Sequence, residues 1–217
     1  MANVQDFLTS LQEELALNEG DNRFVPLVQE GRVSRTVLAV LAAEEHRIVA
    51  SDWRSFLTLA GRAQGSAVRE FFAGLAQGEG MAWQALPPLS AALGMDAAAV
   101  RSYRPQAGCQ AYPAYLAWLA LNAEPADVVV AVTANFAAWG SYCAAIAEAL
   151  RTRYGLDDEA CAFFDFFASP PPDADEVASA ALHEGIEAGL ITDAAGEYGR
   201  LFQNFELMFW NTLADQA

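Results

Sequence analysis

The chain has 217 residues, of which 54% are hydrophobic and 18% are charged, and its formal net charge is -16 at pH 7. This composition is typical of a globular protein with one full core, and it excludes an intrinsically disordered chain. The negative charge argues against nucleic acids and anionic membrane surfaces as partners, because both recruit proteins through Lys and Arg.

The cysteines and the first residues indicate a cytoplasmic protein. Cys109, Cys143 and Cys161 are an odd number, without a CxxC pair or a zinc-binding spacing. Reduced thiols are the simplest interpretation. The N-terminal residues lack a basic region followed by an apolar run, so no signal peptide is visible. Residues 128–147 are uncharged and long enough to span a bilayer, but their polar members favour a central core helix.

Helix is the only periodicity along the chain, which predicts an all-α bundle with a single domain over residues 1–217. Apolar residues at helical spacing, together with glycine and proline breaks, mark the ends of the expected helices. In chain order these cover residues 4–17, 24–28, 34–63, 66–75, 82–93, 96–103, 110–123, 125–154, 157–167, 173–189 and 193–214.

Particular residues set the expected helix ends. Ser34 and Asp96 are suited to cap the helices that follow them, because their side chains accept hydrogen bonds from the first free N–H groups. A turn is expected at residues 78–80, which read Gly-Glu-Gly, and a bend at residues 87–88, which are both proline. Pro113 and Pro125 are expected in first turns, where the missing N–H costs little.

Glu206 is the most informative single residue, and it lies in an aromatic segment over residues 202–210. Residues three and four positions apart share a helical face, so the Glu206 carboxylate is expected among aromatic rings. A carboxylate in such surroundings is costly to keep charged without a partner, and its pKa should rise. Glu206 is therefore a candidate acid or base.

Other predicted helices also carry polar residues within aromatic stripes. Tyr112, Asn135 and Gln203 are the polar members, and Trp139 belongs to one of the stripes. Aromatic stripes at helical spacing are usually core, but buried polar groups need partners. The pattern predicts a central cavity that is lined by aromatic rings and contains a few polar groups. Such a cavity suits a small flat heteroaromatic ligand.

Metal and nucleophile signals are weak. His46 follows two glutamates and His183 precedes one, but neither has the His-x-x-His or Glu-x-x-His spacing that places ligands on one helical face. We expect hydrogen-bonded or solvated histidines, with no metal and no cofactor. Cys109 is the foremost candidate for a cysteine nucleophile, because a helix start lowers a thiol pKa. Cys143 and Cys161 lie in apolar segments, where a thiol usually packs as a small hydrophobe.

Three segments of the chain resemble the TenA/THI-4 family, which has the haem-oxygenase-like all-helical fold. The first is residues 24–63, with Glu44-Glu45-His46 and Asp52-Trp53-Arg54-Ser55-Phe56-Leu57 on the long helix. The second is residues 111–116, Ala-Tyr-Pro-Ala-Tyr-Leu, followed by the apolar helix that ends near residue 150. The third is residues 205–210, which are similar to the family's closing Glu-x-x-Phe-Trp. Most of the chain is covered.

The resemblance implies an activity and assigns residues to it. Family members include thiaminase II enzymes, which hydrolyse a C–N bond on aminopyrimidines of thiamine or of its breakdown products. By this likeness Glu206 is the catalytic glutamate and Tyr112 the site tyrosine that partners it. The acidic residue that grips the pyrimidine, normally an aspartate, falls on Glu45, with Glu44 as the alternative. The family also implies a homodimer or homotetramer.

Two positions depart from the family pattern. Asn135 falls where thiaminases have the nucleophilic cysteine, and an amide cannot form the covalent adduct that a thiolate forms. Phe163 falls where these enzymes usually have a tyrosine. The leading hypothesis is a protein that binds a small nitrogen heterocycle and hydrolyses or deaminates it. Its further binding residues are expected to be Glu45 (or Glu44), Asn135, Trp139 and Phe163. The alternatives are a non-catalytic binding or regulatory protein, and an oxidase of specialised metabolism.

Overall fold

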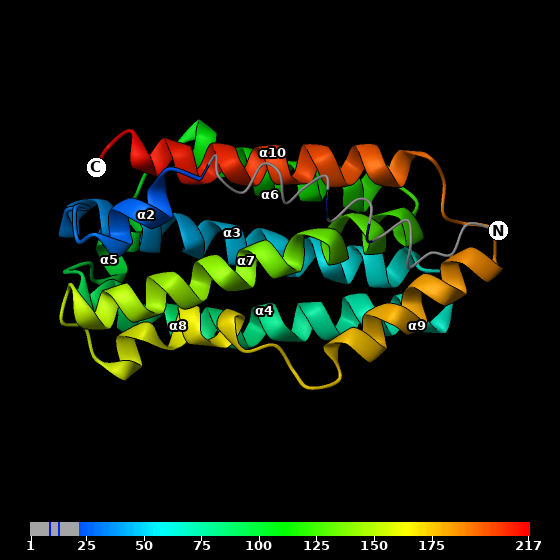
Figure 1. Ribbon diagram of the computed structural model, residues 1–217, viewed down its shortest axis with the longest axis horizontal. Coiled ribbons are helices and arrows are strands. Elements are labelled where there is room, and N and C mark those ends of the chain that lie inside the picture. Colours follow the sequence, from blue (N-terminus) through cyan, green and yellow to red (C-terminus); the bar gives the residue numbers. More distant parts are fainter. Residues whose placement is uncertain (1–8, 10–12, 14–21) are drawn as a thin grey trace.

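The computed structural model describes residues 9, 13 and 22–217, and the regular elements within residues 22–217 are all helices (Figure 1). The helix expected over residues 4–17 falls almost wholly outside the described residues. The elements are α2 (Phe24–Gln29), α3 (Arg35–Arg62), α4 (Ser66–Ala92), α5 (Ala97–Ser102), α6 (Ala107–Asn122), α7 (Pro125–Thr152), α8 (Asp158–Ala168), α9 (Ala174–Glu187) and α10 (Ala194–Ala214). The predicted all-α fold is confirmed.

Two predicted caps are present. The Ser34 hydroxyl accepts a hydrogen bond from the Val37 backbone N–H at 3.3 Å and begins α3. Asp96 accepts one from the Ala99 N–H at 2.8 Å and begins α5. Each satisfies one of the free donors of a first helical turn, which stabilises a helix start by about 1 kcal/mol.

Helix α4 contradicts the predicted turn at residues 78–80. It runs unbroken through Gly78 and Gly80. A Cβ on Gly80 would lie 3.3 Å from the Trp53 ring, which is a tight contact, whereas one on Gly78 would lie 3.6 Å from the Phe166 ring, an ordinary van der Waals distance. Gly80 therefore lets α3 approach α4 closely.

The prolines agree with the prediction in part. Residues 87 and 88 lie inside a helix that continues beyond them to Ala92, as predicted, although that helix is the long α4. Pro113 lies in the interior of α6, because that helix begins at Ala107, earlier than expected. Pro125 does occupy the first turn of α7.

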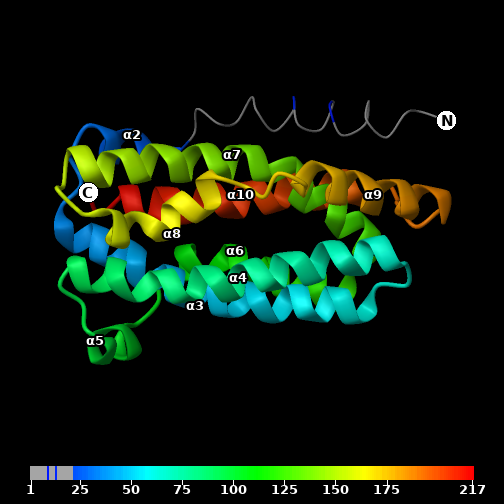
Figure 2. The same ribbon diagram turned by 90° about the horizontal axis from the view of Figure 1, so that it is seen from below.

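The long helices form a closed ring. Helix α3 packs against α4 and α6, α10 packs against α6 and α7, and α8 and α9 connect α7 to α4. Figure 2 shows α3 and α4 along one side of the bundle and α7 and α10 along the other. Side chains from α3, α4, α6, α7 and α10 can therefore meet inside the ring.

Helix α7 is long and apolar enough to cross a membrane by length and composition alone. About half of its most apolar stretch, 53%, is buried against the rest of the protein. It contacts α2, α8, α9 and α10, so the structure places it in the bundle as the predicted core helix.

The hydrophobic core has two parts, one toward each end of the bundle. The first cluster includes Phe24, Leu86 and Trp210, and the second includes Phe72 and Phe202. On five helices, one polar side chain lies between a residue of the first cluster and a residue of the second. These side chains, here called the polar layer, are Asp52, Glu79, Tyr112, Asn135 and Glu206. Their flanking pairs are Val49 and Phe56, Ala82 and Ala76, Cys109 and Leu116, Ala138 and Ala134, and Phe209 and Phe202.

Candidate functional site

Glu206 lies in the polar layer and is almost completely buried, at 3% exposure. The indole N–H of Trp210, one turn later on α10, donates to Glu206 Oε1 at 2.9 Å. Asn135 on α7 also approaches the carboxylate and favours its charged form, although its amide nitrogen makes no well-formed hydrogen bond to a described residue. Burial raises the pKa of Glu206 to about 7, and these two neutral partners limit the rise.

Asp52 faces the same interior from α3. Burial raises its pKa to about 8, while a hydrogen bond donated by the Tyr112 hydroxyl opposes the rise. The sequence predicted that Tyr112 is the hydrogen-bond partner of Glu206. In the structure the Tyr112 hydroxyl donates its hydrogen bond to Asp52 instead. Tyr112 still lies beside Glu206, because the Glu206 charge raises the tyrosine pKa. Oδ1 of Asp52 has no hydrogen-bond partner among the described residues.

Glu45 lies two turns before Asp52 on the same helix and is 1% exposed. Burial raises the pKa of Glu45 well above its usual value, and the charges of Asp52, Glu44 and Glu206 raise it further. Its Oε1 accepts no hydrogen bond from the described residues. A buried carboxylate with a free oxygen and acidic neighbours is costly, which is more often seen at functional sites than in cores.

Glu79 completes the acidic set from α4. As a whole residue it is partly exposed, but its carboxyl group is desolvated in the interior. Desolvation raises the pKa of Glu79, and the charges of Asp52 and Glu45 add to the effect. The close approach of α3 and α4 at Gly80 places Glu79 opposite these two residues.

Glu44 has a different role from its neighbour Glu45. Its Oε1 accepts hydrogen bonds from the Tyr103 hydroxyl at 2.7 Å and from the Gln106 N–H at 2.8 Å. Its Oε2 accepts one from the Gln110 amide at 2.6 Å. Tyr103 and Gln106 belong to the connection between α5 and α6, and Gln110 lies in the first turns of α6, so Glu44 holds this part of the chain against α3. Of the two alternatives for the pyrimidine-binding residue, Glu45 is the one that faces Glu206.

Aromatic rings cover one side of Glu206. The Trp210 ring lies 5.5 Å from that of Trp139 and 5.8 Å from that of Tyr142. The Trp139 ring lies 5.7 Å from the Phe167 ring, and the Phe167 ring lies 5.2 Å from the Phe163 ring. Trp139 is thus a direct neighbour of the Glu206 partner, whereas Phe163 is fully buried behind Phe167 and joins the set through other rings.

The three cysteines are buried free thiols. Cys143 on α7 is close enough to Glu45 and Glu206 for their charges to raise its pKa, after the larger effect of burial. Burial and the charges of Glu44 and Glu45 also raise the pKa of Cys109, contrary to the predicted helix-start activation. Helix α6 begins before Cys109, which removes the thiol from the first N–H position. Both thiols are protonated at neutral pH and are poor nucleophiles.

Both histidines have hydrogen-bond partners. Nε2 of His46 lies 3.0 Å from the Ser90 hydroxyl, and Nδ1 of His183 lies 2.7 Å from the Ser179 carbonyl oxygen. The two lie on α3 and α9 and do not meet. Among residues 22–217, no three His, Cys, Asp or Glu side chains are grouped so that they could hold one metal ion.

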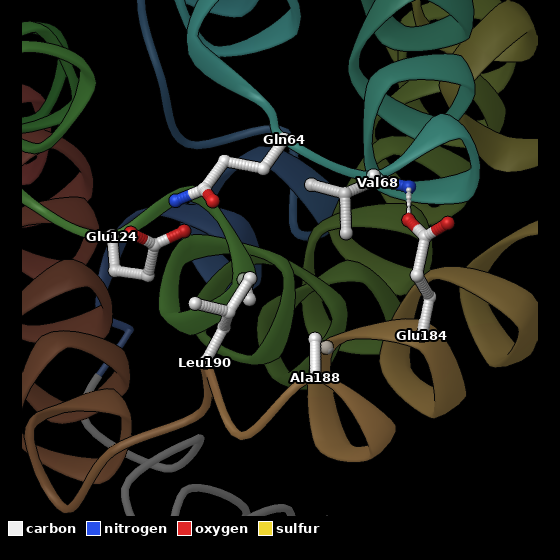
Figure 3. A pocket seen from close by; sticks show the side chains of 9 residues that line it. Gln64, Val68, Glu124, Glu184, Ala188 and Leu190 are labelled. Carbon is white, nitrogen blue, oxygen red and sulfur yellow. Dashed lines mark hydrogen bonds between the residues drawn. The ribbon is translucent and has the colours of Figure 1, made fainter.

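A surface pocket lies at the far end of the bundle from the first core cluster, with a volume of about 260 Å³. Figure 3 shows Glu184 pointing to the start of α4, where it accepts a hydrogen bond from the Val68 N–H at 3.0 Å. Glu184 therefore caps α4, and backbone hydrogen bonds lower its pKa. The pocket wall is made by helix ends, and none of the predicted site residues lines it.

Sequence reasoning missed Asp52 and Glu79 as members of the site. Asp52 follows Glu45 by seven residues, a spacing that keeps both on one helical face, and this signal was available. Glu79 was hidden by its two flanking glycines, which predicted a turn. Gln203 is buried on α10 as expected, with neighbours in the bundle.

Comparison with known proteins agrees with this architecture. Residues 22–187 match the model of the TENA/THI-4/PQQC family. The chain belongs to this family. Glu206 lies beyond the matched range, so its place in the site comes from the bundle geometry and from its likeness to the family's closing motif. No curated protein sequence matches the chain.

Solved structures of TenA homologues share the fold of this TenA-family chain. A TenA family transcription regulator from Silicibacter sp. TM1040 aligns with a TM-score of 0.75 at 16% identity, covering 95% of each chain. A TenA homologue from P. horikoshii OT3 aligns with a TM-score of 0.70 at 14% identity, covering 99% of each chain. A domain from Shewanella denitrificans OS217 with a haem oxygenase-like fold gives 0.71 at 15% identity, covering 98% of this chain and 90% of that one. The predicted fold is confirmed.

Proposed function

We propose that this TenA-family protein binds a small, protonated nitrogen heterocycle in the polar layer. The observation that carries the proposal is Glu206, whose carboxylate is buried and meets only neutral donors, Trp210 and Asn135. Glu45 faces the same space with a free oxygen. A ring N–H⁺ or amino group would supply the missing donors, and Trp139 would offer it an aromatic face.

We further propose that Glu206 transfers protons in the hydrolysis of a C–N bond. A carboxyl group with a pKa of about 7 is populated in both protonation states at neutral pH, as general acid–base catalysis requires. The protonated carboxyl would give its proton to the leaving nitrogen as the C–N bond breaks. A water molecule would add its oxygen to the carbon and return a proton to the Glu206 carboxylate.

Asn135 has a defined role in this scheme. It cannot form a covalent adduct, but its amide lies beside the Glu206 carboxylate and can orient the attacking water or the ligand. Cys143 is close to Glu206 but is not a substitute nucleophile, because burial and two nearby carboxylates keep the thiol protonated. The proposed route therefore uses direct attack by water.

A second candidate is a binding or regulatory protein without catalysis. The presence of Asn135 in place of the family cysteine, with no ionised thiol nearby, favours it. Both candidates predict ligand binding, but only the first predicts release of an amine or ammonia. Measured turnover therefore separates them.

The experiment is a thermal-shift and product-release assay with thiamine and 4-aminopyrimidine. We expect at least one heterocycle to raise the melting temperature of the wild type, because a ligand that binds only the native state stabilises it. Glu206→Gln keeps the shape and an acceptor for Trp210, so it should fold but lose turnover. Glu197→Gln, an exposed position on the same helix, is the matched control. Unchanged turnover in Glu206→Gln would refute the catalytic assignment.

We also propose a cytoplasmic homo-oligomer. Three buried free thiols support a reducing compartment. Exposed apolar side chains occur on the adjacent helices α6 and α10: Trp118 is 48% exposed and Leu121, three residues later on α6, is 70% exposed, and Met208 on α10 is 46% exposed. A second copy of the chain would cover them. Sedimentation of the wild type against Leu121→Asp tests this, and a wild-type monomer would overturn it.

A further inference from the structure

We propose that Asp52 and Glu79 form a subsite for an alkylammonium group, so that the ligand is a heterocycle carrying an aminoalkyl chain. This inference rests on the proposed function and names the ligand class more narrowly. The ring would lie beside Glu206, Asn135 and Glu45, and the ammonium would lie between α3 and α4. The chemistry recognised is a dication whose two charges are separated by several bonds.

The first argument is the arrangement of the carboxylates across the ring of helices. Asp52 and Glu79 influence each other from α3 and α4, whereas Glu206 and Asn135 interact from α10 and α7. Tyr112 lies between the two sides, because the charges of Asp52, Glu206, Glu79 and Glu45 all raise its pKa. Its hydroxyl donates toward the Asp52 side. The polar layer therefore has acidic side chains at two ends, Asp52 and Glu79 at one end and Glu206 at the other.

The second argument is the absence of compensation at the Asp52 end. Oδ1 of Asp52 and Oε1 of Glu45 are buried and lack hydrogen-bond partners among the described residues. The nearest basic residues in sequence, Arg47 and Arg54, are exposed, and Arg47 binds the backbone carbonyls of residues 101 and 103 instead. A buried carboxylate with a free oxygen needs a donor, and an ammonium supplies three.

The third argument selects an organic cation over a metal ion. Glu45 and Asp52 are seven residues apart on α3, about 10 Å along the helix axis at 1.5 Å per residue. A metal site needs its ligands around one point, and no three such side chains within residues 22–217 are grouped in this way. Separated carboxylates suit separated charges along a flexible chain.

Glu79 indicates which end of the ligand lies nearer the surface. It is the one acidic residue of the site that is not fully buried as a residue, although its carboxyl group is desolvated. The ammonium end of the chain would therefore lie nearer the protein surface, where α4 meets α3, and the ring would lie deeper, against Trp210 and Asn135.

Binding of such a dication should release protons. Burial raises the pKa of Asp52 to about 8, so this carboxyl is mostly protonated at pH 7, and burial raises the pKa of Glu45 and Glu79 as well. The titratable groups that face them are Glu44 on α3, Glu79 on α4, Tyr112 on α6, Cys143 on α7 and Glu206 on α10. An ammonium favours the charged carboxylates, so its affinity should increase as the pH rises from 6 to 8, with proton release detectable by calorimetry in two buffers.

The test uses three probes: 4-aminopyrimidine, the same ring with a 4-aminobutyl group on its amino nitrogen, and the 4-hydroxybutyl counterpart. We expect the aminobutyl probe to bind the wild type at least tenfold more tightly than the hydroxybutyl probe. The preference should disappear in the Asp52→Asn/Glu79→Gln double variant. It should persist in Glu70→Gln, an exposed position on α4.

The outcomes separate this inference from the proposed function. Equal affinity for the two tailed probes would overturn the ammonium subsite while ring binding stands. Binding of 1,4-diaminobutane without binding of any ring would overturn the heterocycle proposal and support the subsite. A melting-temperature increase with Mg²⁺ or Mn²⁺ that requires Asp52 would overturn the choice of an organic cation. Circular dichroism of the double variant confirms that it folds.

Discussion

The Trp210 indole donates a 2.9 Å hydrogen bond to Glu206, one helical turn earlier on α10. Both side chains are buried, and the Trp210 ring also stacks on Phe24 at 6.0 Å. One residue thus joins the first core cluster to the candidate catalytic group. The hydrogen bond favours the charged carboxylate, which keeps the pKa of Glu206 near 7 despite its burial.

Replacing Trp210 by phenylalanine should separate these two roles. Trp210→Phe keeps a ring in the core but removes the donor, so the pKa of Glu206 should rise above 7. Infrared spectroscopy of the carboxyl stretch against pH would measure it. We expect a stability loss of about 1–3 kcal/mol from the lost hydrogen bond and volume. Trp118→Phe, at an exposed indole, is the control. An unshifted carboxyl titration would contradict the role of the indole.

The stability of the ligand-free protein should fall as the pH rises from 5 to 8. Asp52 and Glu206 have folded-state pKa values of about 8 and about 7, above the value near 4 of an unfolded carboxyl group. Between these limits the folded state binds more protons than the unfolded state. Each retained proton lowers the unfolding free energy by about 1.4 kcal/mol per pH unit as the pH increases.

Denaturant unfolding across this pH range is the measurement. His46 opposes the trend below about pH 6.5, because burial lowers its pKa and the unfolded state then binds the extra proton. His46 is a single group, whereas several carboxyls hold extra protons in the folded state. The slope of the unfolding free energy against pH therefore stays negative. Asp52→Asn should make this slope less negative by the contribution of about one bound proton. A stability that increases steadily from pH 5 to 8 would show that the buried carboxyls titrate normally.

Glu45→Gln should stabilise the ligand-free protein at pH 8. The change removes a buried carboxyl group that has acidic neighbours and a free oxygen and whose pKa is raised by burial, and it keeps the side-chain shape. We expect a gain of about 1–2 kcal/mol, with weaker ligand binding as the cost. Melting temperatures of the two proteins at pH 8 test this, with the exposed Glu70→Gln as the reference. A destabilised Glu45→Gln would mean that the charged form is compensated in the bundle.

Two glycines of the α4 region should respond oppositely to alanine. A Cβ on Gly65 would collide with the Glu184 carboxylate and displace the cap of α4, so Gly65→Ala should cost about 1 kcal/mol. Gly74 lies within α4, and a Cβ there meets nothing. Gly74→Ala should therefore stabilise by about 0.5–1 kcal/mol through helix propensity. Equal responses in a denaturant titration would argue against the capping role of Glu184.

The acidic chain should not bind DNA directly. Although a structural neighbour is described as a transcription regulator, a net charge of -16 opposes association with phosphates. A mobility-shift assay at low salt with random-sequence duplex should show no complex up to micromolar protein. A complex that weakens with added salt would contradict this expectation.

Much of the fold could be predicted because local signals decide it. The caps at Ser34 and Asp96 and the apolar periodicity of α3 and α10 are properties of short segments. The error at residues 78–80 arose because glycine favours turns in isolation, whereas here both glycines lie inside an unbroken helix and the Trp53 ring packs closely over Gly80. Such packing is not visible in one segment.

The candidate site could be predicted only in part. The Glu206 environment followed from its own helix, since Trp210 lies four residues away. The preference of Tyr112 for Asp52 depends on how far α6 is rotated against α3, which no local pattern contains. The same holds for the different roles of Glu44 and Glu45, which are adjacent in sequence but face the α5–α6 connection and the interior.

The apolar clusters and the polar layer have different roles in the molecule. The apolar clusters on either side hold the helices together, whereas the few side chains between them decide what the protein recognises. Substitutions within the layer can therefore change the ligand while the scaffold stays intact. The layer also makes an occupant part of the interior, so that the two halves of the bundle should resist hydrogen exchange together only when the site is filled.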